Sequence, residues 1–281
     1  MITSRFGAMG TQFEVITRTE AQADRARAFV EEAEQRMSRF RPDSELSVLN
    51  AASSGPVKVS AELAACLTFA ADLRERTGGL VDVGIGAGVL AWGYDRPFAS
   101  GLGLDRTPGP TGLPAWSISG RTVTRSAGTY FDLGGIGKGW TADRAVELGL
   151  AELVSAGGDV RSGRIDTIID IRDPWGTTVA GLALGTGGLA TSSTARRRWQ
   201  VGVETVHHIL DPATGAPART PVLSATAMTN TATEAEAAAK AVLILGVDGL
   251  AWAADQPWIR AALAIWEDGN VYATAGLEVA A

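Results

Sequence analysis

Residues 131–143, FDLGGIGKGWTAD, have the composition of an anion-binding turn. A short run of β-forming residues ends at Asp132, four glycines follow, and Lys138 precedes a helix-like stretch that begins at Trp140. A glycine turn that enters a helix exposes backbone N–H groups, and the positive end of the helix dipole attracts anions. Because Lys138 would add a full positive charge, the segment suits a phosphate. It is equally compatible with an ordinary strand–turn–helix connection.

Two adjacent histidines, His207 and His208, begin the second candidate segment, and residues 207–210 predict a strand. Neighbouring residues of a strand point to opposite faces, so one histidine can be buried while the other is accessible. Asp211 opens the sequence Asp-Pro-Ala-Thr-Gly, which favours a β-turn. The segment is therefore either a structural strand with its turn or a proton-transferring histidine beside a carboxylate.

An alanine-rich stretch, residues 233–245, predicts a helix with polar residues on one face. Ala232, Glu236 and Lys240 are four residues apart and share that face. Thr233 and Glu236 have the spacing of a capping box, and Glu236 and Lys240 that of a favourable helix ion pair. The functional alternative is that this face presents a cation to a ligand.

Two nucleotide-binding fingerprints are excluded. Residues 86–91, GAGVLA, formally fit G-x-G-x-x-A, but the preceding apolar run has only four residues and Gly93 and Pro97 interrupt the helix that should follow. Lys138 is followed by Gly139 and not by serine or threonine, so the segment is not a Walker A loop.

Helices and strands alternate unevenly along the chain. Apolar residues at helical spacing predict helices over residues 22–37 and 60–77, and short apolar runs separated by glycines predict many strands. This mixture favours an α+β fold over a regular βαβ alternation. A chain of 281 residues can form one large domain or two lobes.

Composition excludes several classes of protein. The chain has 46% hydrophobic and 20% charged residues, so we expect a globular protein. Its net charge is −6 and no basic run interleaves with aromatic residues, which argues against nucleic acid as a partner. The single cysteine, Cys66, excludes an intramolecular disulfide and a thiolate metal cluster. Without a secretory leader or an apolar run of membrane-spanning length, we expect a cytoplasmic protein that does not insert into membranes.

Taken together, these segments resemble the ApbE family of FAD:protein FMN transferases, and the motifs occur in family order. They are Met9-Gly-Thr11; Met37-Ser-Arg-Phe-Arg-Pro-Asp-Ser-Glu-Leu-Ser47 with Leu49-Asn50; Gly79-Leu-Val-Asp82 with Trp92-Gly93; Phe131-Asp-Leu-Gly-Gly-Ile-Gly-Lys-Gly139; Ala156-Gly-Gly-Asp159; Ile171-Arg-Asp-Pro174; Ala190-Thr-Ser192; His208-Ile-Leu-Asp-Pro-Ala-Thr-Gly215; and Ala232 through Leu245-Gly246.

The resemblance implies an α+β, ApbE-like fold with mixed or antiparallel sheets, packed helices and a ligand cleft between lobes, in a single domain over residues 1–281. It implies an enzyme that uses Mg²⁺ to split the pyrophosphate of FAD, transfers FMN to a threonine hydroxyl of a partner flavoprotein and releases AMP. His208 would transfer the proton, with Asp211 as a second catalytic residue. The implied FAD contacts are Met9, Phe40 (a tyrosine in many relatives), Leu80, Val81, Asp82, Asp132, Lys138 and Leu210.

The implied metal ligands reveal a departure from the family. They fall on Gly135, Ala232 and Glu236, and a fourth, a threonine in the family, is replaced by Lys240. An ammonium has no lone pair for a cation and repels Mg²⁺, which requires octahedral oxygen ligands. Two hypotheses stay open. Either Lys240 supplies part of the ion's charge in a working transferase, or the chain binds FAD without efficient transfer. The presence of His208 beside the other expected site residues favours the first.

Overall fold

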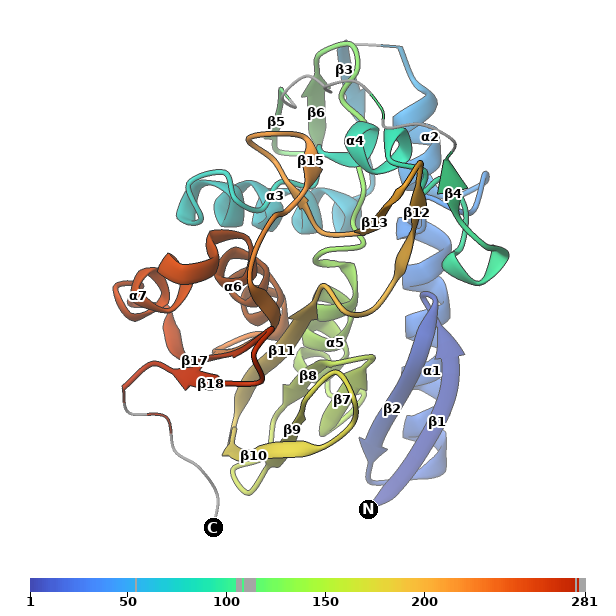
Figure 1. The fold of residues 1–281 in the computed structure, drawn as a ribbon. Helices are drawn as coiled ribbons and strands as arrows, with labels where there is room; N and C mark the ends of the chain where they lie inside the picture. The colour runs from blue at the N-terminus through green and yellow to red at the C-terminus, as the bar shows by residue number, and fades with distance from the viewer. Residues whose placement is uncertain (54, 105–107, 109–114, 276, 278–281) are drawn as a thin grey trace. The chain divides into compact units, whose positions relative to one another are not determined.

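The computed structural model describes residues 1–53, 55–104, 108, 115–275 and 277, which divide into two compact units (Figure 1). Unit 1 comprises Met1–Glu31, Lys138–Arg196 and Arg219–Ala281, and unit 2 comprises Glu32–Gly137 and Arg197–Ala218. One of the boundaries lies between Gly137 and Lys138, inside the glycine-rich segment. Asp132 and Lys138 therefore belong to different units.

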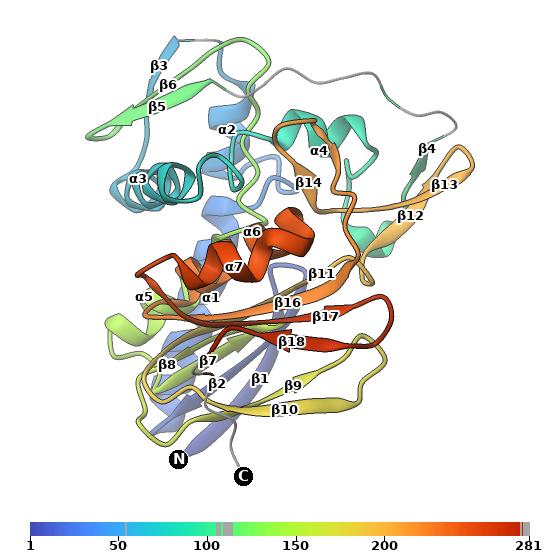
Figure 2. The ribbon, with the colours of Figure 1, turned by 60° about the vertical axis from the view of Figure 1, so that its left-hand side comes forward.

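Unit 1 is built on one eight-stranded sheet, in which every neighbouring pair of strands is antiparallel. Figure 2 shows these strands side by side. In sheet order they are β1 (Ile2–Ala8), β2 (Thr11–Thr17), β7 (Leu153–Ala156), β8 (Asp159–Ser162), β11 (Gly187–Ser193), β16 (Val222–Thr229), β17 (Ile259–Trp266) and β18 (Val271–Ala273).

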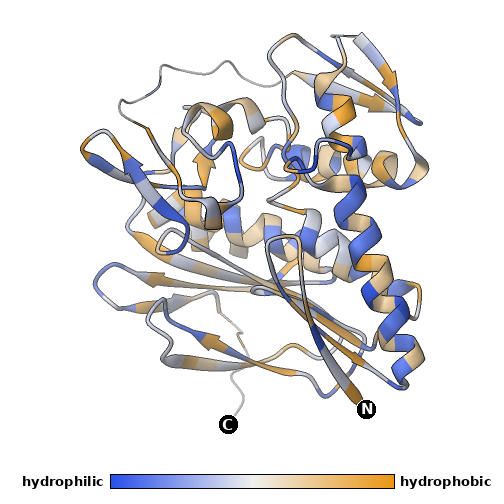
Figure 3. Cartoon of the chain, turned by 90° about the vertical axis from the view of Figure 1, so that its right-hand side faces the viewer, coloured by the Kyte–Doolittle hydropathy of each residue, from blue (hydrophilic) through white to orange (hydrophobic). Residues whose placement is uncertain are grey.

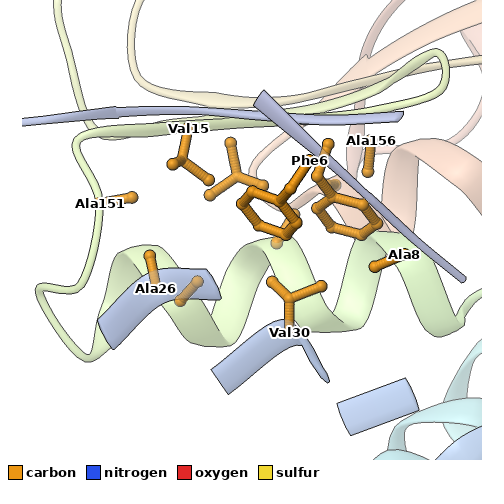
Figure 4. Close-up of a cluster of buried hydrophobic side chains, with 12 residues drawn as sticks. Phe6, Ala8, Val15, Ala26, Val30, Ala151 and Ala156 are labelled. Atoms are coloured by element: carbon orange, nitrogen blue, oxygen red, sulfur yellow. The ribbon is translucent and has the colours of Figure 1, made fainter. Parts of the chain in front are cut away.

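Both faces of this sheet are covered. On one face, α1 (Glu20–Met37) and α5 (Gly137–Glu147) bury an apolar cluster, and Figure 4 shows Val30 of α1 pointing toward Phe6 of β1. On the other face lies the hairpin of β9 (Ile168–Arg172) and β10 (Thr178–Ala183). Val154 belongs to the first cluster and its neighbour Leu153 to the second, as the two-residue period of a strand requires. Figure 3, coloured by hydropathy, shows hydrophobic segments on both the strands and the helices.

The late helix α6 (Ala232–Leu245) packs through its alanines on the large sheet, where Ala238 and Ala239 contact Ala227 of β16. It continues through η2 (Gly246–Asp248) into α7 (Gly249–Ala254). Within the described part of the chain, this segment, Ala232–Ala254, is the one long and apolar enough to cross a membrane by length and composition. Half of its apolar window is buried in the protein, and the core helix of a globular protein passes the same test.

In its described residues, unit 2 contains helices and three small sheets. The helices are α2 (Glu45–Ala51), α3 (Ala61–Arg76), α4 (Gly86–Ala91) and η1 (Phe98–Ser100). The sheets are β3 (Gly55–Lys58), β6 (Thr122–Arg125) and β5 (Trp116–Ser119); β13 (Glu204–His207), β12 (Arg198–Val201) and β4 (Gly103–Leu104); and β14 (Leu210–Asp211) with β15 (Ala216–Pro217). Within these sheets only the β12–β4 pair is parallel.

The α+β prediction is confirmed, and three local predictions are corrected. The strand expected over residues 207–210 is broken, since β13 ends at His207 and β14 begins at Leu210. The helix expected from Trp140 begins three residues earlier, at Gly137. The capping box of Thr233 and Glu236 does not form, because the N-cap of α6 is Thr231, whose hydroxyl accepts the N–H of Glu234.

Candidate functional site

The side chain of Lys138 lies between two buried carboxylates of unit 1. Its Nζ is 2.6 Å from Oε1 of Glu236 and 2.9 Å from Oδ2 of Asp159. Lys138 stands at the start of α5, Glu236 on α6, and Asp159 opens β8 directly after the glycine turn that joins it to β7. Three elements distant in sequence thus meet at one ammonium. Together with Lys240 these residues form what we call the Lys138 cluster.

The fourth glycine of the segment, Gly139, is explained by packing. A Cβ at this position would lie 2.8 Å from the backbone of Ala232, so only glycine lets the starts of α5 and α6 approach this closely. The N–H of Gly139 donates to Oε2 of Glu236 at 3.3 Å. Both carboxylate oxygens of Glu236 therefore accept hydrogen bonds from residues at the start of α5.

Opposite charges shape the electrostatics of the Lys138 cluster. Burial alone would lower the pKa of Lys138, but the charges of Asp159 and Glu236 outweigh it and raise that pKa above its ordinary value. Burial, and then the charge of Glu236, raise the pKa of Asp159 to about 6, against the lowering effects of Lys138 and Lys240. Lys240 is half-buried one helical turn after Glu236, and its charge acts on Asp159. The cluster thus holds two ammonium groups and two carboxylates.

The metal ligands expected in unit 1 do not fit Mg²⁺. Ala232 has no side-chain oxygen, Lys240 has no lone pair, and Glu236 is already bound by Lys138 and Gly139. Among the residues that the structure describes, no group of three or more histidine, cysteine, aspartate or glutamate side chains could hold a metal. Mg²⁺ requires six oxygen ligands in near-octahedral geometry, which this donor set does not supply.

In unit 2, Asp132 is held by a residue that sequence reasoning did not single out. Its Oδ1 accepts the N–H of Gly134 at 2.7 Å, and its Oδ2 lies 2.8 Å from Nε of Arg39. The Arg39 guanidinium lies over the rings of Phe40 and Tyr94, at 4.0 Å and 4.9 Å from their centroids. Arg39 lies inside the resemblance motif that begins at Met37, which was the signal available in the sequence.

A second expected FAD contact, Asp82, stabilises the loop in which it lies. Its Oδ1 accepts the N–H of Gly84 and the indole N–H of Trp116, both at 2.7 Å. The preceding residues are a half-buried Leu80 and a buried Val81. The Asp82 carboxylate is therefore committed to the local structure of unit 2.

The two histidines have different environments. Nε2 of His207 lies 3.1 Å from the carbonyl oxygen of Ala218, and Nδ1 accepts the N–H of Ile209 at 3.3 Å. Burial lowers the pKa of His207, so it is a neutral imidazole protonated on Nε2. His208 is half-buried between β13 and β14. Both histidines are half-buried, so the expected contrast of a buried and an accessible histidine is not seen, whereas both ring nitrogens of His207 contact backbone atoms.

Asp211 ends β14, and its side chain stabilises the turn that follows. Its Oδ1 accepts the N–H of Ala213 at 2.9 Å, and its Oδ2 accepts the hydroxyl of Thr214 at 3.3 Å. These contacts explain the Asp-Pro-Ala-Thr-Gly sequence as a turn, and a catalytic role for Asp211 stays a prediction.

The structure distributes the expected site residues over the two units. Met9, at φ 49° between β1 and β2, receives a hydrogen bond on its sulfur from the hydroxyl of Thr141 at 3.7 Å. Unit 1 holds Met9, Lys138, Ala232, Glu236 and Lys240. Unit 2 holds Phe40, Leu80, Val81, Asp82, Asp132, Gly135, His208, Leu210 and Asp211.

Comparison with known proteins gives concordant results. Residues 9–263 match the model of the ApbE family. The chain is 34% identical to the FAD:protein FMN transferase of Treponema pallidum, over 88% of this chain and 78% of that protein. Two solved structures match 98% of this chain and 97% of their own at 26% identity: the ApbE protein of Thermotoga maritima, with a TM-score of 0.84, and the flavin transferase ApbE of Vibrio cholerae, with 0.78. The chain therefore belongs to the ApbE family.

Proposed function

We propose that this chain is an FAD:protein FMN transferase that moves FMN from FAD to a threonine hydroxyl of a partner flavoprotein and releases AMP. The observation that carries the proposal is the family match over residues 9–263. The described structure adds that Asp132 and Lys138, at the two ends of the glycine-rich segment, are each held by a partly buried ion pair. Membership of this family makes the chain a transferase, with FAD as its substrate.

The proposed reaction breaks a phosphoanhydride bond and forms a phosphoester bond. The threonine hydroxyl oxygen forms a bond to the FMN phosphorus, and the bond from that phosphorus to the bridging oxygen breaks, so that AMP leaves with that oxygen. The hydroxyl proton passes to His208, which acts as general base. His207, neutral and bonded to Ala218, supports the strand end from which His208 projects.

The test is incubation of the protein with FAD and an acceptor flavoprotein domain that carries the target threonine. Mass spectrometry should show one FMN added to the acceptor, and chromatography should show an equal amount of AMP. Flavin binding without either product, with and without divalent ions, would establish the alternative of an FAD-binding homologue without efficient transfer. Replacing the acceptor threonine by valine should abolish labelling and is the matched control.

A further inference from the structure

We propose that the ammonium of Lys240 is the resident cation of the Lys138 cluster, so that this chain takes no divalent ion there and binds FAD without one. The inference rests on the proposed function for its substrate. Whether the Lys138 cluster takes up a divalent ion is a property of the protein alone and can be tested without flavin.

The first argument is a charge balance. Lys138 contacts the carboxylates of both Asp159 and Glu236, so one positive charge faces two negative ones. Without a further cation this group would carry one net negative charge, which is unfavourable both to burial and to an approaching pyrophosphate. Lys240 is half-buried on the same face of α6 as Glu236, one helical turn further on, and its positive charge brings the cluster to neutrality. A divalent ion added to this neutral cluster would leave it with two positive charges.

The second argument concerns the oxygen atoms. Glu236 has one oxygen on the Lys138 ammonium and the other on the Gly139 N–H. A metal ion would have to displace these contacts, and Lys138 would then lose one of its two buried partners. Breaking a buried ion pair is strongly destabilising, so the described geometry opposes metal entry.

The third argument is that close contacts hold the backbone around Glu236 in place. The close approach of Gly139 to Ala232 fixes the start of α5 against the start of α6. The Asp143 carboxylate accepts the N–H groups of Ala232 and Thr233, at 2.7 Å and 2.9 Å, which anchors the same helix start. Glu236 is thus held in the geometry that serves Lys138.

The experiment has one arm without flavin and one with it. In the first, the metal-free wild-type protein is titrated with Mn²⁺, and electron paramagnetic resonance measures the free ion. In the second, calorimetry measures the Kd of FAD in excess EDTA and in excess Mg²⁺. The variants are Lys240→Thr, which removes the charge and supplies an oxygen, and Lys240→Met, which removes the charge alone. Lys58→Thr, at an exposed lysine on β3, is the matched control.

We expect the wild type and Lys58→Thr to leave Mn²⁺ free and to bind FAD equally well, within about twofold, in EDTA and in Mg²⁺. Lys240→Met should bind FAD about tenfold more weakly in EDTA, since a charged contact to the cluster is lost. Lys240→Thr should be equally weak in EDTA and should recover in Mg²⁺, because a hydroxyl and an unbalanced carboxylate then become available to the ion.

Two results would overturn the inference while leaving the proposed function intact. One is a wild-type protein that takes up Mn²⁺ stoichiometrically or loses FAD affinity about tenfold in EDTA. The other is a Lys240→Met variant that folds and binds FAD as tightly as the wild type in EDTA. Absence of FAD binding in every condition would instead overturn the proposed function and the expected flavin affinities. The Mn²⁺ titration would still decide whether the Lys138 cluster takes up a divalent ion. If the Lys240 variants do not fold, the two wild-type measurements alone decide.

Discussion

The carboxylate of Asp143 on α5 accepts the backbone N–H of Thr233 at 2.9 Å and so caps α6, 90 residues further along the chain. It also accepts the N–H of Ala232 at 2.7 Å and the hydroxyl of Thr233. Thr231 caps the N–H of Glu234. The N-terminal N–H groups of α6, which carries Glu236 and Lys240, are therefore satisfied by protein atoms, and this helix end is not an anion site.

Asp143→Ala should lower the free energy of unfolding by about 2–3 kcal/mol, because it removes a helix cap and leaves buried donors without an acceptor. Urea unfolding at neutral pH measures the effect. The matched control is Asp248→Ala, because Asp248 precedes α7 without making a side-chain cap. It should change stability by less than about 0.5 kcal/mol. Equal effects of the two variants would contradict the cap.

The ionisation of Asp143 should appear in the pH dependence of stability. Burial raises the pKa of Asp143 to about 6, although hydrogen bonds from Thr233 and Ala232 and the charge of Arg161 oppose it. The folded protein therefore holds this proton more tightly than the unfolded chain. The stabilisation is complete below the unfolded pKa of 3.8 and is lost as the pH rises through about 6.

Comparison with Asp143→Asn isolates this contribution, since the amide does not titrate. The stability of the wild type relative to the variant should fall by up to about 3 kcal/mol between about pH 4 and about pH 7. Urea unfolding of both proteins across this range gives the difference. A difference that stays constant, or grows with pH, would show that the folded-state pKa is not raised.

The sequence was sufficient for features that depend on local periodicity. Helical spacing predicted α1 and α3 to within two residues at each end. The first residue of the range predicted for α3, Ser60, is its N-cap, whose hydroxyl accepts the N–H of Leu63 at 3.2 Å. The departure at Lys240 was also visible, because it is a change of residue type within a motif.

The contacts that define the site could not be predicted in this way, because they join residues far apart in the chain. Glu236 is 98 residues from Lys138, and Asp132 is 93 from Arg39. Period and composition specify which face of an element is buried but not which element it meets. Lys138 was therefore interpreted as a charge available to phosphate, whereas in the structure its ammonium contacts two carboxylates.

Lys138→Met tests that commitment through stability. The substitution leaves Asp159 and Glu236 buried with a single remaining cation, and we expect a loss of about 3–5 kcal/mol in the free energy of unfolding. Lys58→Met, at the exposed lysine of β3, should have an effect below about 0.5 kcal/mol.

A double-mutant cycle with Glu236→Gln separates the ion pair from lost packing. The double variant should be less destabilised than the sum of the two single variants, because each one alone leaves a buried charge uncompensated. Strict additivity in urea unfolding would show that Lys138 and Glu236 do not act as a pair.

The two adjacent histidines offer the sharpest test of the proposed transfer. His208→Gln should reduce FMN transfer to the acceptor by about 100-fold or more, since it removes the proposed general base. FAD affinity, measured by calorimetry, should stay within about twofold, because proton transfer is not needed for binding. His207→Gln is the matched control, as its ring serves Ala218 and Ile209 and its pKa is lowered by burial. It should retain transfer while losing about 1 kcal/mol of stability. If transfer instead fails with His207→Gln and persists with His208→Gln, the assignment of the base is reversed.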